Sequence, residues 1–298
     1  MGVRRAVELA CNHADSPADK VYTLGPLIHN PQALEDLQQR GVAILDEAKL
    51  PENLSGTVVI IRAHGISPQT EAELRKRGAV VVDATCPKVK ASQLKAASLA
   101  KAGYRLFFAG EESHAEIAGI RGYAQEGWIN GNDAHCKQFL QVVSNAEEAE
   151  SAAKLLSEDP EFHSGPAKTA LIAQTTISAE EYHAIGVVIS RYFPTLEIIP
   201  TICAATKERQ DSLRELLGKV DAVVIAGGKD SANTRRLLGI AQASGKPCVI
   251  VETANDIPPD FLRFETVGLA AGASTPDTVI EAIEQTLKSD CDFATPTK

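Results

Sequence analysis

Residues 57–87 read TVVIIRAHGISPQTEAELRKRGAVVVDATCP, and the prediction of the fold starts from their pattern. The run Val58–Arg62 is short and β-branched, which is typical of a buried strand. The pair Ser-Pro at 67–68 then opens a helix, with an N-cap residue followed by proline at the first helical position, and Gly78 ends it. A second β-branched run follows at Val80–Asp83. A strand, a helix and a strand in this order predict parallel strands joined by a crossover helix.

The same alternation extends over nearly the whole sequence, which predicts an α/β fold. The candidate strands fall into three groups: Val21–Leu24, Val42–Leu45, Val58–Arg62 and Val80–Asp83; Leu106–Ala109, Gln141–Ser144 and Leu171–Gln174; and Glu197–Thr201, Ala222–Ala226, Val249–Glu252 and Val267–Ala270. We expect three αβ units related by a pseudo-threefold axis, with mainly parallel sheets around a central cavity. The units are expected at residues 1–85, 86–201 and 202–290, followed by a tail at 291–298.

Capping residues and prolines mark the starts of several helices: Asn30-Pro31, Ser67-Pro68, Ser178 with Glu181, and Thr275-Pro276. Between the helices and strands of the middle unit, we expect loops or insertions at Ala124–Phe139 and Ser157–Lys168.

Composition excludes several classes of protein. The chain has 298 residues, of which 44% are hydrophobic and 23% charged, and its net charge is −9. A negative net charge argues against a general binder of nucleic acid or of anionic membranes. The longest apolar runs have the length of strands, far below that of a membrane span. We therefore expect neither nucleic acid nor membrane as a partner.

The N-terminal stretch and the cysteines indicate a cytoplasmic protein. Met1–His13 is amphipathic and interrupted by Arg4, Arg5 and Glu8, so it predicts a helix rather than a secretory signal. The six cysteines form no CxxC pair and no framework spacing, which argues against structural disulfides.

Polar residues gather between each predicted strand and the next helix. These segments hold His29, His64 and His114, together with Cys86 and Cys203. In parallel sheets, ligands bind outside the carboxyl ends of the strands, where helix N-termini bind anions. Histidine, serine and asparagine donors suit a phosphate or diphosphate, and two thiols that each precede a helix suit a metal or cluster. If the units face one another, the sequence predicts anion binding beside a metal centre.

A structural interpretation competes with the functional one. A histidine before a helix is commonly a surface residue, and a cysteine at a strand end is commonly a core residue. For residues outside the strand-end loops we prefer this structural interpretation: Cys11, Cys136, Cys248, Cys291, His13, His135 and His183.

In these same loops the sequence resembles the 4-hydroxy-3-methylbut-2-enyl diphosphate reductases. The matching motifs occur in family order over roughly residues 1–285: GVRRAV, IHNPQ, RAHGIS, DATCP, HAEIAG, QTTIS, TICAAT followed by ERQ, GGKDSANTRRL and GLAAGASTPD. Each motif is weakly specific alone, but their combination in register is highly specific.

The resemblance implies three αβ units around a [4Fe-4S] cluster that is held by one cysteine from each unit. It implies reductive removal of the allylic hydroxyl group in the non-mevalonate isoprenoid pathway, which yields isopentenyl and dimethylallyl diphosphate. The electrons are expected from a ferredoxin or a flavodoxin.

Carried over motif by motif, the resemblance assigns roles to single residues. Glu116 is expected to donate the proton, and Thr175 to position the substrate hydroxyl group. Cys86 and Cys203 are expected to bind iron. The diphosphate is expected to bind His29, His64, His114, Ser231, Asn233 and Ser274.

The sequence departs from the family at its first residues. The first cluster cysteine of the family belongs to a GFC-x-GV-x-RA pattern, and here Met1 occupies the position after that cysteine. Cys11 is no substitute, because it lies about 13 Å further along the predicted helix. The third cysteine ligand is thus absent from the printed chain. A second departure is Ala232, where many relatives carry serine.

Two explanations of the missing cysteine remain open. An internal methionine has been taken as the start of a normal enzyme, or the chain is a relative with a cluster that is labile or absent. The second explanation gives an alternative function, a cluster-deficient and catalytically impaired diphosphate-binding protein. A zinc hydrolase that uses Cys86, Cys203 and a histidine is a third possibility, weakened by the lack of a close ligand pair.

Overall fold

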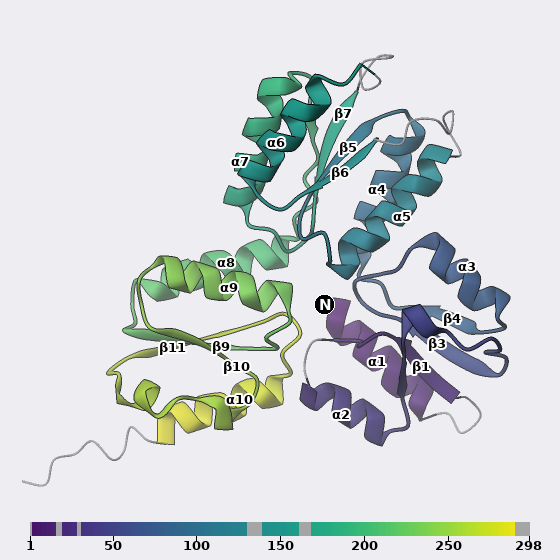
Figure 1. The fold of residues 1–298 in the computed structure, drawn as a ribbon. Helices are drawn as coiled ribbons and strands as arrows, with labels where there is room; N and C mark the ends of the chain where they lie inside the picture. Colours follow the sequence, from purple (N-terminus) through teal and green to yellow (C-terminus); the bar gives the residue numbers. More distant parts are fainter. Residues whose placement is uncertain (1, 16–19, 29–30, 130–138, 161–167, 290–298) are drawn as a thin grey trace, which may run out of the picture. The chain divides into compact units, whose positions relative to one another are not determined.

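Three parallel sheets with interleaved helices make up the fold (Figure 1). The protein is represented by a computed structural model, which describes residues 2–15, 20–28, 31–129, 139–160 and 168–289. These residues form two compact units. Unit 1 comprises residues 1–27 and 40–203 and contains the first two sheets. Unit 2 comprises residues 28–39 and 204–298 and contains the third.

The first sheet has the strand order β2-β1-β3-β4. Its strands are β1 (Lys20–Leu24), β2 (Ala43–Leu45), β3 (Thr57–Ile61) and β4 (Val80–Asp83). The helices around it are α1 (Gly2–Ala14), η1 (Glu47–Lys49) and α3 (Pro68–Lys76), while α2 (Pro31–Gln39) belongs to unit 2. Ser67 caps α3, because its hydroxyl group accepts the Thr70 N–H.

The second sheet has the order β6-β5-β7-β8. Its elements are α4 (Pro87–Lys101), β5 (Arg105–Ala109), α5 (Ala115–Ile129), β6 (Leu140–Val143), α6 (Ala146–Ser157), β7 (Thr169–Ala173), α7 (Ala179–Tyr192) and β8 (Glu197–Ile198). Helices cover both faces (Figure 1). Phe107 packs among residues of α6 and α7, and its neighbour Phe108 packs among residues of α4 and α5, as expected for alternating side chains of a buried strand.

The third sheet has the order β10-β9-β11. Its elements are α8 (Ala204–Leu217), β9 (Ala222–Ala226), α9 (Ala232–Ala243), β10 (Cys248–Val251), η2 (Ala254–Asp256), η3 (Pro259–Arg263), β11 (Val267–Ala271) and α10 (Asp277–Ser289). Every residue of β9 is buried, because the strand lies between two others and is covered on both faces.

The α/β fold with mainly parallel sheets is confirmed, and so is the capping box of Ser178 and Glu181. The pseudo-threefold axis, the central cavity and the unit boundaries stay predictions. Two expectations were wrong. The strand at Glu197 was grouped with the third sheet, but it pairs with β7 through the short crossover α7. The expected loop at Ala124 is helical up to Ile129, because Gly127 lets α5 approach the Ala97 backbone closely.

Within the described part of the chain, no helix combines the length and the apolar character that a membrane span requires.

Candidate functional site

Glu116 and Thr175 form a buried pair at the centre of the strand-end loops of unit 1. Glu116 lies in the first turn of α5 and is 1% exposed, while Thr175 follows β7 and is 6% exposed. The carboxylate oxygen Oε1 accepts the Thr175 N–H at 2.7 Å, and Oε2 accepts the Thr175 hydroxyl group at 2.9 Å. Both carboxylate oxygens are thus held by one residue that lies 59 positions away.

The side chain of Gln174 connects the same two loops. Its side chain is fully buried, and its Oε1 accepts the Glu111 N–H at 3.0 Å while its Nε2 donates to the Thr176 hydroxyl group at 2.9 Å. A Cβ atom on Gly110 would lie 2.7 Å from Gln174 Oε1, so glycine leaves the room that this amide needs. The loop after β5 and the loop after β7 are therefore fixed to each other before any ligand binds.

His64 and His114 meet beside this pair. His64 follows β3 and His114 follows β5, and their ring centroids lie 5.2 Å apart in an edge-to-face arrangement. His114 precedes α5, and its Nδ1 accepts the Glu116 N–H at 3.2 Å. A nitrogen that accepts carries no proton, so in the neutral ring the proton lies on Nε2. His114 therefore presents an N–H donor on its other side.

The two predicted cysteine ligands are bonded to the same loops through their backbones. The Cys86 N–H donates to the Ala63 carbonyl at 2.9 Å, next to His64. The Cys203 N–H donates to the Thr175 carbonyl at 3.0 Å. Both thiols are free and half-buried, and each cysteine directly precedes a helix. Both cysteines lie in unit 1, so their loops are built into the framework that carries Glu116.

The first turn of α1 packs directly on Cys86. A Cβ atom on Gly2 would lie 2.7 Å from Cys86 Sγ, so only glycine fits there. One turn further, the Arg5 guanidinium group donates to the Thr85 carbonyl at 3.2 Å and to the Asp83 carbonyl at 3.4 Å. The start of α1 is thereby tied to the loop that carries Cys86.

The charged side chains of Asp83 and Lys90 also stabilise the loop that carries Cys86. The Asp83 carboxylate accepts the Thr85 N–H and pairs with the Lys90 ammonium group at 3.0 Å. Burial raises the pKa of Asp83, but hydrogen bonds from Thr85 and Lys90 outweigh it and hold the pKa below its ordinary value. Burial likewise lowers the pKa of Lys90, while its bonds to Tyr123 and Asp83 bring the net pKa above the ordinary value. Asp83 is therefore ionised at neutral pH.

Unit 2 contributes a loop of a different kind. Ser231 caps α9, since its hydroxyl group accepts the Thr234 N–H. Asn233 is 5% exposed, and neither atom of its carboxamide has a hydrogen-bond partner among the described residues. The hydroxyl group of Thr234 is also buried without a partner in this part of the structure. Ser274 is half-buried in the turn before α10. Unpartnered groups of this kind are expected at a site that a ligand completes.

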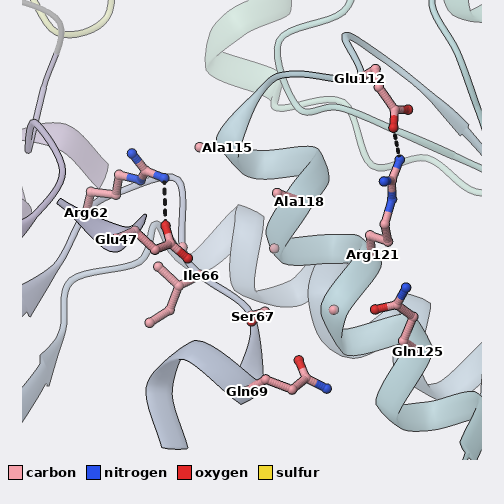
Figure 2. Close-up of a pocket in the computed structure, with 13 residues that line it drawn as sticks. Glu47, Arg62, Ile66, Ser67, Gln69, Glu112, Ala115, Ala118, Arg121 and Gln125 are labelled. Atoms are coloured by element: carbon pink, nitrogen blue, oxygen red, sulfur yellow. Dashed lines mark hydrogen bonds and ion pairs between the residues drawn. The ribbon is translucent and has the colours of Figure 1, made fainter. Parts of the chain in front are cut away.

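The structure also contains a cavity of about 390 Å³ beside the unit 1 loops (Figure 2). Arg62 pairs with Glu47 on one side of it, and Arg121 pairs with Glu112 on the other. The loop at Gly65–Ser67 and one face of α5 complete its walls. His64, His114, Glu116 and Thr175 do not line it. The cavity therefore lies next to these four residues but is not lined by them.

The structure thus brings together His64, His114, Glu116 and Thr175 in unit 1 and Ser231 with Asn233 in unit 2. His29, Cys136 and Cys291 lie outside the described residues. Among the described residues, no group of three or more histidine, cysteine, aspartate or glutamate side chains forms a metal site. Gly2 and Arg5 were not predicted as part of the site. Their place in the GVRRAV motif, the first to match the family, was the signal that could have identified them.

Comparisons with known proteins agree with the motifs. A family model described as "LytB protein" matches residues 1–288. A 4-hydroxy-3-methylbut-2-enyl diphosphate reductase from Treponema pallidum is 41% identical over 97% of this chain and 80% of its own length. The reductase of the same name from Aquifex aeolicus is 38% identical over 98% of this chain and 93% of its own length.

Solved structures give the same result. The E-1-hydroxy-2-methyl-but-2-enyl-4-diphosphate reductase from Plasmodium falciparum superposes with a TM-score of 0.79 at 26% identity, over 94% of this chain and 82% of that one. A second structure, described as the terminal enzyme of the non-mevalonate pathway, gives 0.67 at 37% identity, over 97% of this chain and 95% of that one.

Proposed function

The chain belongs to the LytB family of 4-hydroxy-3-methylbut-2-enyl diphosphate reductases, and we propose that it catalyses the reaction for which these relatives are named. The C–O bond of the allylic hydroxyl group breaks, and the oxygen leaves as water. Two electrons and two protons balance the reaction. The products are isopentenyl diphosphate and dimethylallyl diphosphate. We place the protein in the non-mevalonate pathway and in the cytoplasm.

The observation that carries the proposal is the buried pair of Glu116 and Thr175. The Thr175 N–H can only donate, so Glu116 Oε1 is always an acceptor. Oε2 is therefore the oxygen that can hold a proton, and it faces the Thr175 hydroxyl group at 2.9 Å. A hydroxyl group both accepts and donates. Thr175 can thus orient the substrate hydroxyl group and connect it to the proton on Glu116.

The diphosphate is assigned to His29, His64 and His114 together with Ser231, Asn233 and Ser274. Two observations support this assignment. His114 presents Nε2–H, because its Nδ1 is occupied by the Glu116 N–H. Asn233 is buried at the N-terminus of α9 with an unpartnered carboxamide, and a helix N-terminus attracts anions.

Cys86 and Cys203 would hold an iron–sulfur cluster. Thiolates are the usual ligands of such clusters, and both thiols are free, half-buried and bonded through their backbones to the loops of Ala63 and Thr175. The chemistry of these donors fits the [4Fe-4S] cluster of the family. When bound, the cluster supplies electrons and a Lewis-acidic iron. The electrons are proposed to come from a ferredoxin or a flavodoxin.

The test compares the printed chain with a variant that carries Gly-Phe-Cys ahead of Met1, here called the extended variant. The proximity of Gly2 to Cys86 Sγ supports this design, because the added cysteine would precede Gly2 by two residues. After anaerobic reconstitution, we expect strong brown absorbance, a cluster signal in electron paramagnetic resonance and reductase activity in the extended variant, and little of each in the printed chain. An extended variant that binds zinc without iron or sulfide would contradict the proposal.

A second candidate function is a cluster-deficient protein that binds diphosphates. The specific observation in its favour is that the described residues offer no set of three or more metal ligands. This candidate predicts that the printed chain binds inorganic pyrophosphate with full affinity, and that the extended variant gains neither iron nor activity.

A further inference from the structure

Gln93 is a polar residue on the buried and mostly apolar face of α4, where the other buried polar residue, Ser92, donates its hydroxyl group to the Lys88 carbonyl. Gln93 is 1% exposed and lies about two helical turns after Cys86. Its neighbours on the same face, Val89, Ala96 and Ala100, are apolar and at most 4% exposed. A carboxamide at such a position costs free energy unless it is hydrogen-bonded. The position therefore calls for a reason other than packing.

The carboxamide of Gln93 contacts two glycines that lie close in sequence to His64 and Glu116 and that line the adjacent cavity. Its Nε2 lies 2.4 Å from the position of a Cβ atom on Gly65 and 2.8 Å from that on Gly119. Gly65 directly follows His64 and has a left-handed backbone, with φ at +72°. Gly119 lies one turn after Glu116 on α5. The amide is thus wedged between the turn that carries His64 and the helix that carries Glu116.

The Nε2 of Gln93 has no hydrogen-bond partner among the described residues. The Ile66 carbonyl oxygen lies close to the same place, 3.4 Å from the position of a Cβ atom on Gly119. In the described part of the chain, the other carboxamide that is buried without a partner belongs to Asn233. Both unpartnered carboxamides therefore lie beside residues assigned to the diphosphate.

We propose that Gln93 is a positioning residue for this diphosphate site. Its carboxamide lies between the Gly65–Ile66 turn and α5, where its N–H group can bond to the turn, and so it sets the place of His64 relative to Glu116 in the free protein and in the complex. This proposal rests on the function proposed above, since it assumes that His64 binds the anion.

The test uses the full printed chain and three variants. Gln93→Met keeps the shape of the side chain but removes the donor, and Gln93→His restores an N–H donor. Thr169→Val is the matched control, because the Thr169 hydroxyl group is also buried without a partner in unit 1 but lies at the far end of β7. Two quantities are measured: the affinity for inorganic pyrophosphate by calorimetry, and the NMR shift of the His64 ring in the free protein.

We expect Gln93→Met to weaken pyrophosphate binding by about threefold to tenfold, the equivalent of one hydrogen bond. The His64 signal should move, and the melting temperature should not fall. Gln93→His should recover most of the affinity, and Thr169→Val should change neither quantity. Unchanged affinity and an unmoved His64 signal in Gln93→Met would overturn the proposal. A wild-type chain that fails to bind pyrophosphate, while the His64 signal still moves in Gln93→Met, would overturn the diphosphate function but support Gln93 as the residue that holds the turn.

Discussion

Glu116 and Gln174 at the strand ends of unit 1 bond to neighbouring loops, whereas the side chains of Asn233 and Thr234 at a strand end of unit 2 have polar groups without a partner among the described residues. Glu116 has both carboxylate oxygens bonded to Thr175, and Gln174 has both ends of its carboxamide bonded. In unit 2, Asn233 has neither end bonded within the described residues. The chemistry assigned to unit 1 needs a fixed geometry, and the binding assigned to unit 2 needs unsatisfied donors.

The largest expected effect concerns the proton that unit 1 is proposed to deliver. Glu116→Gln in the extended variant keeps the shape of the side chain and the bond to the Thr175 N–H, but removes the acidic proton. We expect the turnover number kcat to fall by roughly 10²- to 10⁴-fold, the usual contribution of a general acid. The affinity for pyrophosphate should stay unchanged. Steady-state kinetics measure both effects.

The control for this substitution is Glu112→Gln, which changes an exposed carboxylate just before α5 that pairs with Arg121 on that helix. It should leave kcat unchanged. A Glu116→Gln variant with wild-type kcat would contradict the proposal that Glu116, bonded to Thr175, donates the proton.

Asn233 provides the next largest effect. Asn233→Ala should weaken the binding of pyrophosphate by roughly 10- to 150-fold, the range for a hydrogen bond to a charged group. Stability should not fall, because the variant loses a buried amide that had no partner in the described structure. Calorimetry and thermal unfolding measure the two quantities. Gln242→Ala, on the exposed face of α9, is the control and should change neither.

A substitution of Thr175 is expected to lower stability, unlike the substitution of Asn233. Thr175→Val removes the hydroxyl group that donates to Glu116 Oε2, so a buried carboxylate loses one hydrogen bond. We expect the free energy of unfolding to fall by about 1–3 kcal/mol, measured with urea. Thr169→Val is the same substitution at a threonine without a partner, and it should not destabilise the protein. If both variants lost the same free energy of unfolding, the difference between hydrogen-bonded and unpartnered hydroxyl groups would be contradicted.

The smallest effect is the pH dependence of the loop before Cys86. The pKa of Asp83 is lower in the folded chain than its ordinary value, so the unfolded chain binds more protons as the pH falls. The stability that Asp83 contributes is present above its ordinary pKa and is lost as the pH falls through the folded pKa. Asp83→Asn should lower stability at pH 7 and flatten the acid side of the stability profile. Asp260→Asn, at an exposed position, should leave the profile unchanged.

Much of the fold could be predicted from local patterns. The β-branched runs and the Ser-Pro and Asn-Pro pairs consist of consecutive residues, so they can be recognised from the sequence alone. Strands such as Val80–Asp83 and helices such as α3 were therefore predicted at or near their observed bounds. The sheet to which Glu197 belongs could not be predicted in this way, because pairing with β7 depends on where α7 returns the chain. The end of α5 could not be predicted either, because Gly127 serves the close approach to the Ala97 backbone, a contact between residues that are distant in sequence.

The site was predictable in its residue types but not in its bonds. The order of the motifs identified Glu116 and Thr175 as partners of one substrate. The direct bond between them depends on the register of β5 against β7, and no local pattern encodes that register. Gln93 shows the same limit, since its contact with Gly65 and Gly119 joins three segments that are distant in sequence.

The most direct test of the central claim follows two side-chain amides by ¹H–¹⁵N NMR while isopentenyl diphosphate is added. We predict that the NH₂ signals of Asn233 shift and become protected from exchange, whereas those of Gln174 are protected from the start and do not change. A titration in which the ligand binds while the Asn233 signals stay in place would contradict the claim that the unpartnered carboxamide of Asn233 in unit 2 bonds to the diphosphate.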